Sequence, residues 1–63
     1  MDKKYYEDKI ADAKRRQEKW RDRYRRAVEL GDTFTTGLAL EGVKRWEAYE
    51  HYYNIRLKEA AAN

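Results

Sequence analysis

Side chains that commonly carry catalysis or bind metals are sparse in this chain of 63 residues. There is no Cys and no Ser, and the only Thr residues, at 33, 35 and 36, are better suited to capping a helix than to acyl transfer. Glu47 and the sole histidine, His51, could share one helix face, but a zinc site needs three or four protein ligands. The glycines match no nucleotide-binding spacing. We therefore expect no enzyme activity, no metal, no cofactor and no small-molecule substrate.

Positive charge is concentrated in residues 14–26, KRRQEKWRDRYRR, which hold eight of the 15 cations of the chain. On a helix these cations divide into two flanks. In one flank Lys14, Arg21 and Arg25 surround Glu18, which neutralises part of their charge. The other flank, called the basic ribbon below, consists of Arg15, Arg16, Lys19, Arg23 and Arg26.

Two interpretations of the basic ribbon remain open. In the first, it is a solvated helix face that carries the i,i+4 pairs Asp12–Arg16 and Asp22–Arg26. In the second, it contacts phosphates or an acidic protein surface. Five phosphate contacts would give binding without base recognition, and its affinity would fall with a log–log salt slope of about −4.5.

The elements that must position these residues are two long helices. Residues 3–30 contain neither Gly nor Pro, which favours one unbroken helix. Its seam, spaced by 4 and 3 as in a heptad, consists of Tyr6, Ile10, Ala13, Gln17, Trp20, Tyr24 and Ala27. Trp20 and Tyr24 are thus expected in a helix interface and not among the cations as stacking platforms for bases. Gln17 either fixes the register of the pair or lies half exposed at its rim.

A turn at about 31–35 should follow, in which Gly31 ends the first helix and Asp32 can cap the next. The Thr residues are alternative caps, so the second helix begins between 33 and 36 and continues to about 60. Its seam is Ala39, Gly42 or Val43, Trp46, Tyr49, Tyr53, Leu57 and Ala60. The predicted fold class is therefore all-α, a single domain over 1–63.

Because the turn is short, the two helices must lie antiparallel as an αα-hairpin. This arrangement places Tyr6 near Leu57 and Ala60, and Trp20 near Gly42 and Trp46. A chain of this size hides only about 60% of its unfolded surface and has no disulfide to compensate. Dimerisation of two hairpins into a four-helix bundle is the simplest remedy.

A second apolar line is left over on the second helix. Ala48, Tyr52 and Ile55 follow one another at i, i+4 and i+7, roughly opposite Trp46 and Tyr53. Phe34 and Leu40 also lie off the seam. Since a two-helix hairpin has one mutual face, we expect Ala48, Tyr52 and Ile55 to bind a partner, either a protein or a second copy.

The function expected from these features is that of a small protein-interaction module, a regulator or inhibitor that occupies a surface of another protein. The alternative is a small basic protein that binds nucleic acid through the basic ribbon. No apolar run is long enough for a membrane span or a signal peptide, so we expect a cytoplasmic protein. The start at Met1 and the small size suggest a complete gene product, of phage or mobile-element origin.

Overall fold

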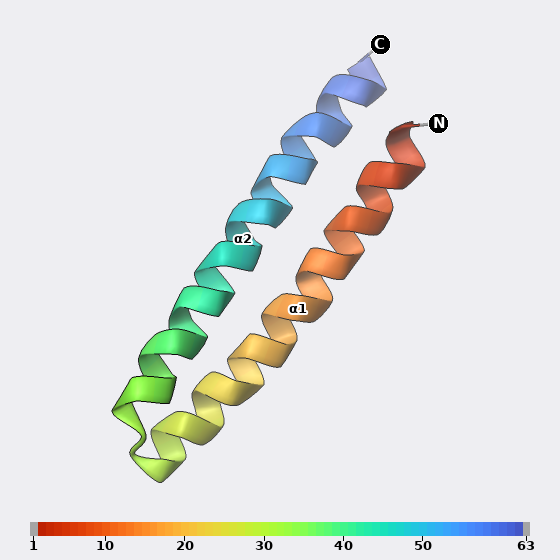
Figure 1. Cartoon of the computed structure of the whole chain (residues 1–63). Helices are drawn as coiled ribbons and strands as arrows, with labels where there is room; N and C mark the ends of the chain where they lie inside the picture. The colour runs from red at the N-terminus through yellow and green to blue at the C-terminus, as the bar shows by residue number, and fades with distance from the viewer. Residues whose placement is uncertain (1, 63) are drawn as a thin grey trace.

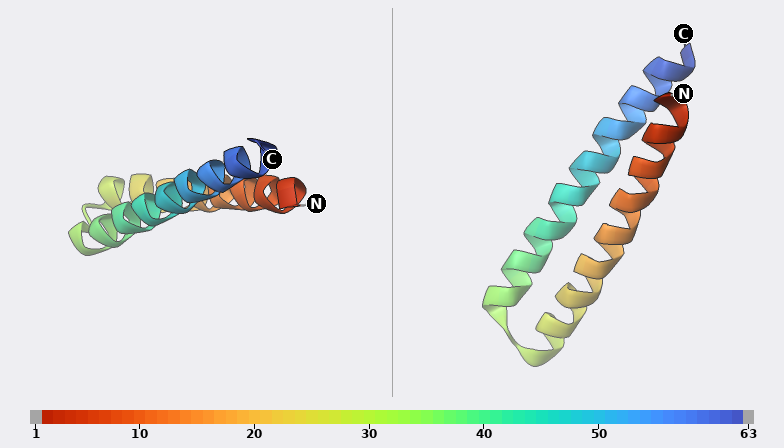
Figure 2. Two further views of the ribbon diagram at one scale, coloured as in Figure 1. Left: turned by 90° about the horizontal axis from the view of Figure 1, so that it is seen from above. Right: turned by 45° about the vertical axis from the view of Figure 1, so that its right-hand side comes forward.

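Two antiparallel helices make up the fold, as the computed structural model of the chain shows for residues 2–62 (Figure 1). Helix α1 spans Asp2–Leu30 and helix α2 spans Thr33–Ala62. They form a rod of 49 × 13 × 9 Å. Figure 2 shows from two further directions that the helices remain adjacent along this rod and that both chain ends lie at one end of it. The predicted all-α hairpin is thus confirmed.

Helix α1 ends where Gly31 takes the left-handed conformation, with a φ of 69°. The Gly31 N–H donates a hydrogen bond to the carbonyl of Val28 at 3.1 Å, and the Asp32 N–H donates to the carbonyl of Ala27 at 2.9 Å. These two bonds form a Schellman motif, which satisfies carbonyls that the end of a helix leaves without partners. The helix therefore ends at the residue type that allows the reversal at the lowest steric cost.

Asp32 caps the start of α2. Its carboxylate accepts hydrogen bonds from the N–H of Thr35 at 3.0 Å and from the Thr35 hydroxyl at 2.6 Å. The Thr36 hydroxyl donates to the carbonyl of Asp32 at 2.8 Å. Because Asp32 is the cap and none of the Thr residues is, α2 begins at Thr33 and the connection is two residues long, shorter than the expected turn over 31–35.

The helix interface is built from small side chains. Its buried positions are Ala13, Gln17 and Ala27 on α1 and Ala39, Gly42 and Val43 on α2. A Cβ atom placed on Gly42 would lie only 2.6 Å from Cε2 and 2.7 Å from Cε3 of Trp20, so the indole packs directly on the α2 backbone. The expected contact between Trp20 and Gly42 is confirmed, and it brings the two helices close together.

The large rings of the seam lie at the rim of this interface. The rings of Tyr6 and Tyr53 are 6.3 Å apart, and Tyr6 borders the same shallow hollow as Ala60, as expected. Tyr24 and Tyr49, which the spacing also places on the seams, are 37% and 44% exposed, so these two positions are not buried. Two closely spaced helices shield only their innermost positions, and a long side chain at the edge of the seam remains in contact with water.

Gln17 is the buried polar residue of the interface, only 4% exposed. Its side-chain amide donates to the carbonyl of Trp46 at 3.3 Å and to the carboxylate of Glu50 at 2.6 Å. Its carbonyl accepts a hydrogen bond from Arg21 at 3.3 Å. The alternative of a half-exposed Gln17 was therefore wrong. These bonds can form in only one alignment of the helices, because a shift by one turn would leave a buried amide unsatisfied.

The contact at Gly42 predicts opposite effects for two Gly→Ala substitutions. Gly42→Ala should destabilise the hairpin by about 1 to 3 kcal/mol, since the rigid indole of Trp20 must move. Gly37→Ala is the matched control: apart from the adjoining backbone of its own helix, the structure has no atom within 4 Å of the added Cβ, and the lower entropy of the unfolded chain should stabilise α2 by about 0.5 to 1 kcal/mol. Urea unfolding followed by circular dichroism measures both. Equal effects of the two substitutions would contradict the close contact.

The cap at Asp32 predicts a loss of stability in acid. The Thr35 hydroxyl and then its N–H hold the pKa of Asp32 below the ordinary value of 3.8. A carboxyl whose pKa is lowered by folding stabilises the protein above its unfolded pKa, and this contribution is lost as the pH falls through the folded pKa. The melting temperature should thus fall below about pH 4.

Asp32→Asn separates this effect from other acid-dependent losses, because Asn also caps helices but does not titrate. The variant should lose less stability than the wild type below about pH 4. Some loss will remain, since the hydrogen bond from Arg16 also lowers the pKa of Asp12. Superimposable acid profiles of the two proteins would rule out the role given to Asp32.

Candidate interaction surfaces

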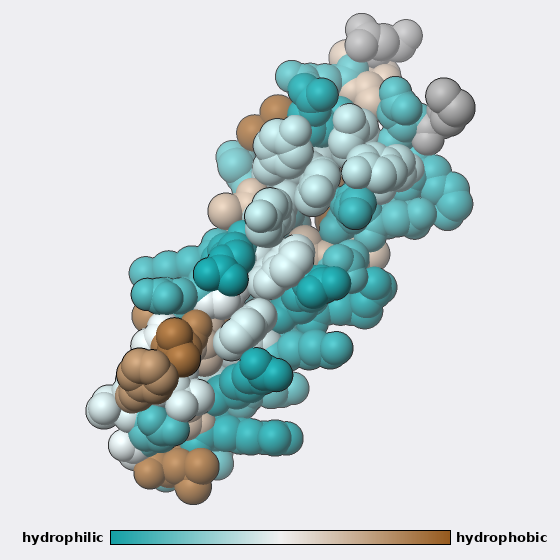
Figure 3. All heavy atoms as spheres, viewed as in Figure 1, coloured by the Kyte–Doolittle hydropathy of each residue, from teal (hydrophilic) through white to brown (hydrophobic). Residues whose placement is uncertain are grey.

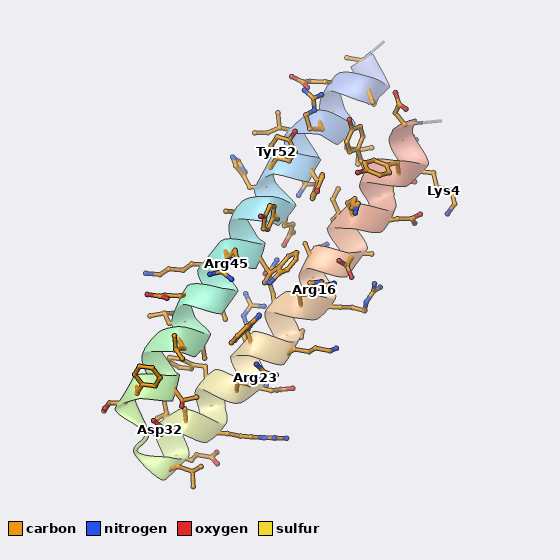
Figure 4. The ribbon with its side chains drawn as sticks, in the orientation of Figure 1. Lys4, Arg16, Arg23, Asp32, Arg45 and Tyr52 are labelled. Carbon is orange, nitrogen blue, oxygen red and sulfur yellow. The ribbon has the colours of Figure 1, made fainter. Side chains whose placement is uncertain are left out.

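A second heptad line follows the face of α2 that α1 does not cover. Its members, called the outer stripe below, are spaced by 4 and 3 and are all exposed: Phe34, Leu38, Glu41, Arg45, Ala48, Tyr52 and Ile55. Phe34 is 75% and Tyr52 52% exposed, and Figure 4 shows Tyr52 on the side of α2 that faces away from α1. At 3.6 residues per turn, the stripe lies about 140° around α2 from the buried seam. The hairpin itself cannot bury it.

Hydrophobic surface is densest near the turn. Figure 3 shows it over the start of α2 and over the turn, while the α1 side of the same view is hydrophilic. Phe34 and Leu38 belong to this region, and Leu30 is also well exposed. Exposed apolar residues that gather on one part of a small chain are typical of a binding surface.

Further along the outer stripe, the surface of α2 is hollowed. The hollow is lined by Arg45, Ala48, Tyr49, Tyr52 and Tyr53, and almost all of its surface comes from apolar atoms of these residues. The first four of these residues follow the spacing i, i+3, i+4 and i+7, which is the set of positions that forms a hole for a knob from another helix. The hollow can therefore receive one aliphatic or aromatic side chain of a partner.

Two of the three predicted partner-binding residues lie in this hollow and the third does not. Ala48 and Tyr52 line the hollow, whereas Ile55 lies outside it, on the same stripe and exposed. The full length of the stripe was missed in the sequence, because Glu41 and Arg45 interrupt its apolar members. The signal was present in the unbroken 4 and 3 spacing from Phe34 onward.

Acidic residues neutralise only one end of the basic ribbon. Arg15 and Arg16 each lie 3.0 Å from a carboxylate oxygen of Asp12, which confirms the expected Asp12–Arg16 pair. The expected Asp22–Arg26 pair is wrong, since Asp22 pairs with Arg25 on the other flank.

The rest of the ribbon is free to contact an anion. Between residues 2 and 62, Lys19, Arg23 and Arg26 form no ion pair. Their cationic groups are exposed to solvent. The ribbon is thus only partly a self-neutralised helix face.

Two tryptophans lie directly beneath the ribbon. The guanidinium of Arg23 lies 4.8 Å from the ring centroid of Trp20, and that of Arg16 lies 4.6 Å from the ring centroid of Trp46. Figure 4 shows Arg16 in the middle of α1 and Arg23 nearer the turn. These cation–π contacts favour the observed positions of the guanidinium groups.

The middle of the ribbon forms a cleft of about 340 Å³. It is lined by Asp12, Arg15, Arg16, Lys19, Trp20 and Arg23. The expectation that Trp20 takes part only in the interface was therefore incomplete: the ring packs on Gly42 and also borders this cleft. A cleft that combines guanidinium and ammonium groups with an aromatic surface suits an anion with an aromatic or apolar part.

The residues considered as metal ligands take other positions. Glu47 forms an ion pair with Arg21 across the helix interface at 3.3 Å, and His51 is exposed. Among residues 2–62, no three His, Cys, Asp or Glu side chains come together in a group that could hold a metal ion. Over the same residues, neither helix has an apolar stretch that would cross a membrane.

The chain was compared with known proteins at the level of both sequence and fold. No protein-family model, no curated protein and no solved structure matches it. The candidate surfaces are thus characterised by their own geometry.

Proposed function

We propose that this chain is a small non-enzymatic interaction module that binds another protein through the outer stripe of α2. The observation that carries the proposal is the uninterrupted heptad line from Phe34 to Ile55, exposed along its whole length. Heptad spacing on a helix is the pattern by which one helix packs against another. The chain uses this pattern twice on α2, once towards α1 and once towards solvent.

The energetics of the hairpin support an additional partner. Its buried interface consists mainly of Ala, Gly and Val, and among residues 2–62 no large side chain is fully buried. Burying a fully exposed large apolar side chain contributes about 1.5 to 3 kcal/mol, and a side chain that is already half covered contributes roughly half as much. Covering Phe34, Leu38, Tyr52 and Ile55 would therefore add a stabilisation comparable to the whole stability expected of so small a core.

The mode of action that follows is occupation of a surface. A helix that presents side chains at i, i+4 and i+7 fits an apolar groove or a facing helix, and its binding blocks other contacts at the same place. The chain would thus act as a regulator or inhibitor of the protein that it binds. A second copy is the simplest partner, and two hairpins would then form an assembly of four helices.

Substitutions in the outer stripe test the proposal directly. Tyr52→Ala and Ile55→Asp should leave the helix content unchanged, because both side chains face away from α1, but should weaken association with a partner at least roughly tenfold. Tyr5→Ala is the matched control, since Tyr5 is 54% exposed but lies on α1, outside the stripe. Circular dichroism measures the helix content, and sedimentation together with affinity capture measures association. Equal association of the wild type and both stripe variants would refute the proposal.

A second candidate function, the binding of nucleic acid by the basic ribbon, is favoured by the cleft around Trp20. Arg23 lies over the indole and Lys19, beside it, forms no ion pair within residues 2–62, so phosphate contacts and stacking of a base on the Arg23 guanidinium can be made at the same place. The binding would be dominated by charge and would fade with salt.

Charge reversal of the free cations distinguishes the two functions. The double variant Lys19→Glu, Arg23→Glu should abolish retention on single-stranded nucleic acid at low salt. The control Lys44→Glu, Lys58→Glu has the same net charge, but its substitutions lie on α2. It should retain most of the binding. If both variants lose binding equally, the effect is one of net charge, and the ribbon is a solvated face.

A further inference from the structure

We infer that the partner of the outer stripe is a second copy of this chain, lying antiparallel on it with Glu41 of each copy opposite Arg45 of the other. The inference rests on the proposed function and names its partner. The stripe is self-complementary in shape and in charge, as the following register shows.

In an antiparallel pair related by a two-fold axis, residues that face each other lie equally far from the axis along the helix. An axis level with Val43 sets Phe34 opposite Tyr52, Leu38 opposite Ala48 and Glu41 opposite Arg45. Each of these contacts occurs twice, because a two-fold interface uses the same residues of both copies. The matched segment from Phe34 to Tyr52 is about 27 Å long.

The shape of the surface agrees with this register. Leu38, which is exposed in the hairpin, meets the hollow of the second copy at Ala48. It would enter there as a knob into a hole, between Arg45 and Tyr52. Phe34, the more exposed residue, would pack on the ring of Tyr52 at the edge of the same hollow. Both apolar residues at the start of α2 are covered in this way.

Charge complementarity selects this register over its neighbours. An axis shifted by half a heptad towards the C-terminus would place Glu41 opposite Tyr52 and Phe34 opposite Glu59, so that charges face rings. A parallel pair would bring Glu41 against Glu41 and Arg45 against Arg45, and facing like charges are strongly unfavourable. Only the antiparallel register centred on Val43 pairs both polar members of the stripe with opposite charges.

Glu41 and Arg45 are also free to make these contacts. They are spaced i,i+4, as are the paired Lys4 and Asp8, yet within residues 2–62 neither of them forms an ion pair. Both are exposed. Their charges would otherwise only interrupt the apolar line, whereas in the proposed pair they determine its register and direction.

The proposed contact has two structural consequences. Since the stripe and the buried seam are about 140° apart, the four helices form an open layer with both α2 helices at its centre, and not a closed square bundle. The basic ribbon lies on α1 and remains uncovered. Any other protein that binds the outer stripe must compete with the second copy.

Exchange of the two charges tests the register. Glu41→Arg alone and Arg45→Glu alone each place like charges opposite one another twice, and each should weaken self-association at least roughly tenfold. An equimolar mixture of these two variants should associate again, because every Arg then faces a Glu of the other chain. The double variant Glu41→Arg, Arg45→Glu should associate as the wild type does. Sedimentation velocity over micromolar to millimolar concentrations measures all five samples, and circular dichroism checks that each chain is helical.

The outcomes separate this inference from the function on which it rests. Weaker association of both single variants than of the wild type, together with recovery in the mixture, supports the antiparallel contact, because a parallel wild type would already place like charges opposite one another. Dimers that persist unchanged in both single variants, or single variants that do not recover on mixing, overturn the register. A wild type that remains monomeric throughout overturns the inference. In that case the proposed function still stands if Tyr52→Ala and Ile55→Asp abolish capture of another protein, and it fails with the inference if they do not.

Discussion

The contact of the Trp20 indole with the bare backbone at Gly42 sets the geometry of the whole hairpin. Because no Cβ separates them, the helices approach closely, and small residues such as Ala13 and Ala39 fill most of the space between them. Gln17 then fixes the alignment through its hydrogen bonds to α2. A close interface of small residues is well defined but buries little apolar surface, so the hairpin gains its precise arrangement at the expense of a large core.

The surfaces available for function follow from this constraint. The tyrosine rings that do not fit between the helices lie at the rim. Trp20, which packs on Gly42, and Trp46 also support the guanidinium groups of the basic ribbon. Within residues 2–62 nothing covers the opposite face of α2, and its exposed apolar residues keep the heptad spacing of a helix interface. One helix thus has two packing faces, of which the hairpin uses one. We regard the second face as the main binding surface and the ribbon as a separate one.

The sequence was sufficient to predict the architecture, because α1 contains no helix-breaking residue, Gly31 and Asp32 are strong end signals, and both seams keep regular spacing. It was less informative about side chains at the edge of the seam. Whether Tyr24 is shielded depends on how closely the helices approach, which periodicity does not define. Asp22 forms its ion pair with Arg25 and not with Arg26, and this pairing depends on side-chain rotamers. The full outer stripe was overlooked because Glu41 and Arg45, its two charged members, look like ordinary surface residues. Their place in the stripe becomes clear only when Glu41 of one copy is set opposite Arg45 of a second copy.

The most direct test of the central claim, that a second copy of this chain covers the outer stripe of α2, is the ¹⁵N NMR spectrum of the wild-type protein recorded as it is diluted. The chain has no Pro, so the backbone amides along both helices can report. The account predicts that the concentration-dependent shifts lie on α2 between Phe34 and Ile55, while amides of the basic ribbon stay unchanged. Shift changes confined to α1, or a spectrum that does not change with concentration, would contradict it.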